Sequence, residues 1–161
     1  MQFRRLGLVL VALLIVLASL AGCVAASDMA WPDREITTDV DTALAAQDMG
    51  MAGLMMGSVT WTEAEFSSFL TYLTKQNTGG ALPLDEIKVW FGAGNQVFIE
   101  LTPTAGGMLT APVRLAGTLA VVDNMVQVNV SEAAVGGAAV MGPLLEVVNG
   151  AVNRALGDPS L

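Results

Sequence analysis

The sequence contains no histidine, and its single cysteine is Cys23. Without histidine, Ser-His-Asp and Cys-His catalysis lack their base, and zinc, copper and haem sites lack their usual ligands. One cysteine cannot form an internal disulfide, so the fold must rest on its apolar core. We therefore predict that the protein is not an enzyme and has no cofactor and no metal site.

Basic residues are also scarce, with seven lysines and arginines against 15 acidic residues. Arg4 and Arg5 are two of the seven, so the chain from Cys23 onward has five basic residues and a net charge of −10. Nucleic acids require a dense basic face that neutralises phosphates, and anionic lipid headgroups attract clusters of lysine and arginine. The composition thus excludes a nucleic-acid partner, and any contact with membrane or lipid must be apolar.

The chain begins with the pattern of an export signal. Arg4 and Arg5 precede an apolar run over residues 6–17, and small residues then lead to Cys23. The segment Leu20-Ala21-Gly22-Cys23 resembles the bacterial lipobox, in which the cysteine thiol receives a diacylglyceryl group and the cysteine becomes the new N-terminus. The alternative is an uncleaved transmembrane anchor, which needs roughly 20 apolar residues. We predict a signal peptide over residues 1–22 and a bacterial envelope protein, held outside the cytoplasm by lipid on Cys23.

The 139 residues from Cys23 onward suit a single domain. Residues 23–35 are predicted to be a lipidated tether, and residues 36–161 a single α+β domain. The tether lacks the long Gly/Ser or Pro run of an extended linker. The domain should therefore lie close to the bilayer.

Three segments have the pattern of a helix. The first begins with a Thr38 cap and ends at Gly50. The second begins with a capping box between Thr62 and Glu65 and ends at residues 77–80. Its apolar residues repeat as on one helix face: Phe66, Phe69, Leu70 and Leu73. The third begins at Pro143 and ends at Gly157.

Between the second and third helices, apolar residues alternate with a period of two, which predicts two antiparallel hairpins. The first hairpin joins residues 87–91 to residues 97–101, and the second joins residues 113–121 to residues 126–130. Polar residues alternate with these apolar residues along the strands. One face of the sheet should therefore be exposed to solvent and the other covered. The expected fold is α+β, with helices packed on one face of a curved antiparallel sheet of about four strands.

Four methionines cluster just beyond the first helix, interleaved with glycine: Met49, Met51, Met55 and Met56. Methionine is flexible and adapts to irregular surroundings. Ordinary gap-filling in the core is the favoured interpretation, and a pliable apolar lining or membrane-facing loop is the alternative.

The carboxylates have no catalytic or metal-binding pattern. Glu63 and Glu65 lie two residues apart on a helix and point in different directions, and Asp39, Asp41 and Asp48 lack the spacing of a calcium loop. Nothing in the spacing of the remaining candidates brings them together: Asp85, Glu86, Glu100, Asp123 and Glu132.

The order of these features resembles the YpmS-like and LmeA-like families of small bacterial envelope proteins. The resemblance covers roughly residues 36–157, from the Trp61-Thr62-Glu63 opening to the helix with Asn149 and Asn153. These families look related to the tubular lipid-binding folds, in which a long helix lies in the grip of a highly curved sheet. The resemblance implies an apolar tunnel or groove for lipid.

The predicted function is binding or transfer of lipid or another apolar ligand by a membrane-anchored lipoprotein. Ten apolar residues are candidates for the ligand lining, although each also suits an ordinary core: Phe66, Phe69, Leu73, Val89, Phe91, Val97, Ile99, Leu119, Val121 and Leu145. The alternative is a non-catalytic structural lipoprotein that binds an envelope protein through an exposed apolar patch.

Overall fold

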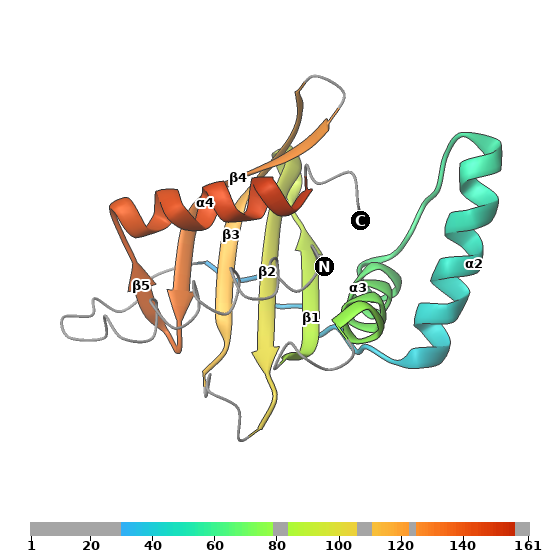
Figure 1. Ribbon diagram of the computed structural model, residues 1–161, viewed down its shortest axis with the longest axis horizontal. Coiled ribbons are helices and arrows are strands. Elements are labelled where there is room, and N and C mark those ends of the chain that lie inside the picture. Colours follow the sequence, from blue (N-terminus) through green and yellow to red (C-terminus); the bar gives the residue numbers. More distant parts are fainter. Residues whose placement is uncertain (1–29, 79–83, 106–110, 123–124, 157–161) are drawn as a thin grey trace.

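The computed structural model describes residues 30–78, 84–105, 111–122 and 125–156, so the predicted signal peptide and Cys23 lie outside the described residues. The described part is α+β, with a five-stranded antiparallel sheet in the order β1-β2-β3-β4-β5 and helices packed on it (Figure 1). The elements follow one another as α2 (Val40–Met56), α3 (Glu63–Thr78), β1 (Leu84–Phe91), the 3-10 helix η1 (Ala93–Asn95), β2 (Gln96–Pro103), β3 (Val113–Val122), β4 (Met125–Val135), β5 (Ala138–Val140) and α4 (Pro143–Leu156). The predicted fold class is confirmed.

Both predicted hairpins form, with Val89 opposite Ile99 in the first and Leu119 opposite Val128 in the second. Two features of the sheet were not predicted. β5 adds a fifth strand beside residues 133–135 of β4. The register between β3 and β4 also shifts at Ala116 and Gly117, which bends the sheet, as β-bulges do.

The apolar core lies on the sheet face that α4 covers. Its buried side chains come from four strands and from Val148 of α4, and Phe66 and Leu70 of α3 pack against them. The strand members are Val89, Val97, Val113, Leu115, Val128, Val130 and Ala133. Helices therefore cover this face, as the alternation predicted.

The opposite face of the sheet was predicted to be exposed to solvent. It is partly covered, because the segment before α2 crosses it. Trp31 packs edge-on against Trp90 and Phe98, with ring centroids 5.3 and 5.6 Å apart, and the Arg114 guanidinium lies 5.0 Å from the centre of its ring. Trp90 Nε1 donates a hydrogen bond to the Arg34 carbonyl. The tether was predicted to continue to residue 35; in its described part Trp31 and Arg34 contact the sheet, and Ile36 just beyond it is buried.

α3 lies along the free edge of β1. The Oγ of Ser67 accepts a hydrogen bond from the Val89 amide and donates one to the Val89 carbonyl, and Thr71 does the same at Ile87. Ser67 and Ser68 are fully or almost fully buried, whereas Leu73 is exposed. The apolar face was predicted to be the buried one, but a hydroxyl-bearing face is more buried, because it satisfies the backbone of an edge strand.

α4 covers the part of the β4 edge that does not pair with β5. The Asn149 Oδ1 accepts from the Val130 amide, and Asn153 both accepts from the amide and donates to the carbonyl of Val128. Polar side chains one helical turn apart thus satisfy backbone groups at the free edge of β1 and at the part of the β4 edge that β5 does not pair with.

α2 packs on the outer side of α3, and its far end projects away from the sheet (Figure 1). Its N-cap is Asp39, not the predicted Thr38, since the Asp39 side chain accepts from the Thr42 amide at 2.8 Å. Thr38 instead donates to Glu86. The helix was predicted to end at Gly50, but it continues to Met56 and closes at Gly57, whose φ of 81° suits glycine.

Candidate functional site

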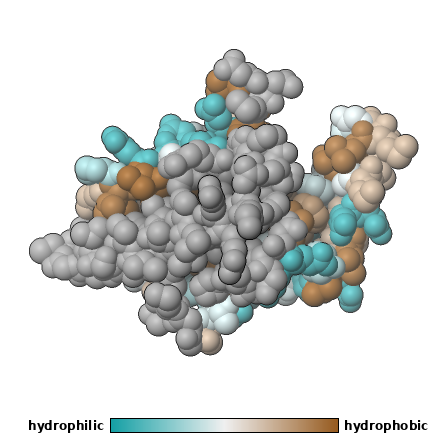
Figure 2. Space-filling view, viewed as in Figure 1, coloured by the Kyte–Doolittle hydropathy of each residue, from teal (hydrophilic) through white to brown (hydrophobic). Residues whose placement is uncertain are grey.

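The second half of α2 exposes large apolar side chains. Leu54 is 84% exposed, Met55 92% and Met56 78%, and Met51 and Val59 are also exposed. Figure 2 shows brown and pale residues at the projecting end of this helix, at the upper right. We call residues 49–59 the α2 tip. Exposed apolar groups in a contiguous patch are typical of interaction sites.

The composition of the inner face of α2 explains this exposure. Ala43, Ala46 and Gly53 are its buried residues. A β-carbon on Gly50 would lie 2.7 Å from the Trp61 ring, and one on Gly53 would lie 2.6 Å from the Ser58 carbonyl oxygen. Only small residues fit this close approach, so the bulky side chains of α2 must point outward.

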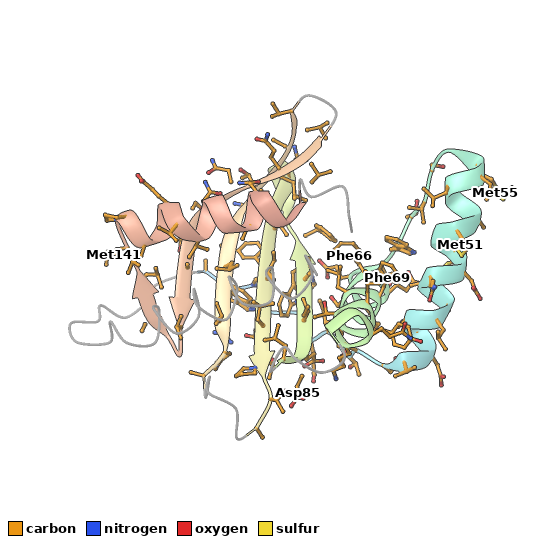
Figure 3. All side chains as sticks on the ribbon, viewed as in Figure 1. Met51, Met55, Phe66, Phe69, Asp85 and Met141 are labelled. Carbon is orange, nitrogen blue, oxygen red and sulfur yellow. The ribbon has the colours of Figure 1, made fainter. Side chains whose placement is uncertain are left out.

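Polarity changes along the axis of α2. The first half carries Asp39 at its cap, followed by Asp41 and Asp48, whereas residues 49–62 contain no charged residue. Figure 3 shows Met51 and Met55 on the projecting part of the helix, away from the sheet. The tip is therefore an apolar end on a helix with an acidic base.

The base of the tip is held by aromatic packing. Trp61 Nε1 donates a hydrogen bond to the Ala46 carbonyl at 3.0 Å, and its ring packs against Phe66 and Phe69 with centroids 5.8 and 5.4 Å away. The favoured interpretation placed the clustered methionines in the core. It is wrong for all four, Met49, Met51, Met55 and Met56, which are exposed.

The structure divides the ten candidate lining residues. Six are buried in the core or pack against it: Phe66, Val89, Val97, Ile99, Leu119 and Leu145. Phe69 packs on Trp61. Three are exposed: Leu73, Phe91 and Val121, the last of them by 73%. The six have a packing role in the core, and the exposed apolar tip of α2 lies outside the set. Exposure could not be predicted from the spacing of the methionines alone.

The partly buried carboxylate of Glu63 has a structural role. It pairs with Arg34 at 2.7 Å and accepts from the Phe91 amide. Burial raises the pKa of Glu63, but the hydrogen bonds from Arg34 and Phe91 and the Arg34 charge outweigh burial, so the pKa is lowered overall. Arg34 in turn has a raised pKa because it donates to Glu63.

The two other perturbed carboxylates cap helices. The Thr62 amide and hydroxyl donate to Glu65 and lower its pKa, and the Thr62 hydroxyl accepts from the Glu65 amide, so the predicted capping box is confirmed. The Thr42 amide and hydroxyl lower the pKa of Asp39.

The carboxylates considered for catalysis have local partners. Glu86 pairs with Lys88, Glu100 with Arg114, and Asp85 accepts from Thr104. Glu132 is exposed, and Asp123 lies outside the described residues. Within the described ranges, no three acidic or cysteine side chains are placed to hold a metal ion.

No known protein family, curated protein or solved structure matches this chain. The resemblance to the YpmS-like and LmeA-like families therefore stays a prediction from the sequence pattern. Among the helices of the described segments, none has the length and apolar character needed to cross a membrane.

Proposed function

We propose that this protein is a lipid-anchored bacterial envelope protein whose extracytoplasmic domain binds lipid or another apolar ligand through the α2 tip. The observation that carries the proposal is the exposure of Leu54 and Met55, at 84% and 92%, on a helix whose inner face is already filled. Covering a leucine or methionine side chain fully is favourable by roughly 1.5–3 kcal/mol. A ligand that covers both side chains gains much of that free energy.

Two further observations support an apolar ligand. Residues 49–62 carry no charge, so the tip has no electrostatic preference for a charged ligand. Gly50 packs closely against Trp61, and Gly53 against Ser58. The outward side chains of α2 therefore have no room to turn inward. In this proposal the tip is a binding surface, and the carboxylates of the domain cap helices and form ion pairs without taking part in catalysis.

The second candidate function is docking of an envelope protein on the same surface. Methionine favours it, because flexible side chains adapt to different protein partners. In this case the domain is a structural or adaptor lipoprotein.

The proposal has two parts that are tested separately. The intact mass of the membrane-extracted protein should show diacylglyceryl on Cys23 and loss of residues 1–22, and Cys23→Ser should remove both. With residues 1–22 replaced by a conventionally cleaved signal peptide, the Cys23→Ser form should be released without lipid and should bind a fluorescent fatty acid below its micelle concentration. Absence of lipid on Cys23 overturns the anchor. A folded domain that binds no fatty acid overturns the ligand class and favours a protein partner.

A further inference from the structure

The acidic groups of α2 lie in its first half, beside the exposed Val40 and Leu44, whereas its second half exposes apolar side chains alone. Asp39, Asp41 and Asp48 precede the tip, and no charge follows until Glu63. Surface helices that lie flat on membranes have an apolar side and a side rich in lysine and arginine. α2 contains neither lysine nor arginine. Its polarity is graded along the axis, which suits entry of the helix end into an apolar phase.

The distance to the anchor restricts where the tip can reach. Ala30, the first described residue, lies seven positions after Cys23. Fully extended, this segment spans at most about 25 Å. α2 itself has 17 residues, which gives a length of about 25 Å at 1.5 Å per residue. A lipid on Cys23 therefore holds Ala30 within about one helix length of the bilayer, which keeps the domain that carries α2 close to the membrane.

From this we infer that the α2 tip inserts end-on into the bilayer that carries the Cys23 lipid, with Met51, Leu54, Met55 and Met56 at the boundary between headgroups and acyl chains. The inference rests on the proposed function, of which it names the ligand. A bilayer is favoured over a protein partner because it accepts a convex projecting end without a complementary surface. It also needs no charge on the tip.

The single native cysteine makes a direct test feasible. The full-length protein with Met55→Cys is reconstituted in phosphatidylcholine vesicles and labelled with an environment-sensitive fluorophore. Cys23 is blocked by its lipid. Met141 provides the matched control, because it is 62% exposed and lies between β5 and α4, far from α2 in Figure 3.

The inference predicts that the label at position 55 shifts to shorter wavelength and loses at least half its emission when the vesicles contain a lipid-borne quencher. The label on Met141→Cys should stay in water and be unquenched. Adding Leu54→Gln to Met55→Cys should reduce the quenching at least twofold, and salt should have little effect, since the tip is uncharged.

Equal, water-like emission from both positions overturns the insertion. The intact mass of each preparation shows whether Cys23 carries lipid, so failure of the anchor is recognised independently. Binding of monomeric fatty acid without insertion would leave the proposed function standing and overturn only the bilayer contact. Quenching that appears only after a purified envelope protein is added would assign the tip to a protein partner and also overturn the inference.

Discussion

At the residue scale, Gly117 allows the sheet to bend. It is buried in β3 at the register shift, and a β-carbon there would overlap the Asn129 carbonyl oxygen on the neighbouring strand. The neighbouring atoms belong to the backbone, so they cannot move aside as a flexible side chain does.

Gly117→Ala should therefore lower the free energy of unfolding by roughly 1–3 kcal/mol, the usual cost of overpacking. The matched control is Gly92→Ala, because the nearest atoms there belong to the flexible Gln96 side chain. Urea unfolding of the two variants measures the difference, and equal stability would contradict the close approach.

A second prediction concerns Glu63 and pH. Its pKa is lowered in the folded protein below its ordinary value of 4.5. The ionised Glu63 carboxylate therefore stabilises the fold at pH values above its pKa in the unfolded protein. This stabilisation is lost as the pH falls through its pKa in the folded protein. The melting-temperature gap between wild type and Glu63→Gln should be largest near neutral pH and should narrow below about pH 4. A gap that stays constant from pH 7 to pH 3 would show that ionisation of Glu63 does not stabilise the fold.

At the element scale, α3 and α4 satisfy free backbone groups along β1 and β4 with polar side chains. Ser67→Ala should leave the buried Val89 amide without its partner and destabilise the domain by about 1–3 kcal/mol. Amide hydrogen exchange should be faster at Val89. Thr71→Ser is the conservative control, since it retains the hydroxyl that pairs with Ile87. Unchanged protection at Val89 in Ser67→Ala would argue against this role of Ser67.

Local signals predicted the order of the helices and both hairpins, because capping and alternation depend on residues close in the sequence. The Thr62–Glu65 capping box is an example, whereas the cap and the end of α2 were predicted wrongly. The partners of Ser67 and Asn153 could not be predicted, because their hydrogen bonds join residues 22 and 25 positions apart. For the same reason, Trp31 could not be placed on the second face from the sequence.

At the scale of the whole molecule, the candidate site depends on which apolar residues remain after the core is filled. The strands and α4 fill the core, and α3 together with Ala43 and Ala46 of α2 closes its flank. Leu54 and Met55 are left outside. The spacing of the methionines does not show whether a methionine is buried or exposed, because that depends on the small residues on the inner face of α2.

Replacing these two side chains should separate binding from stability. Leu54→Gln with Met55→Gln keeps good helix formers and alters exposed positions, so the free energy of unfolding should change by less than about 1 kcal/mol. Met141→Gln with Val147→Gln alters apolar residues that are 62% and 48% exposed on the other side of the molecule and serves as the control.

The most direct measurement is the dissociation constant of the Cys23→Ser form, secreted through a conventionally cleaved signal peptide in place of residues 1–22, for a fluorescent fatty acid, with and without these paired substitutions. We expect the α2 pair to weaken binding at least tenfold, corresponding to a loss of about 1.4 kcal/mol, while the control pair leaves it within twofold. Equal affinity in both variants would contradict the assignment of the α2 tip as the apolar binding surface.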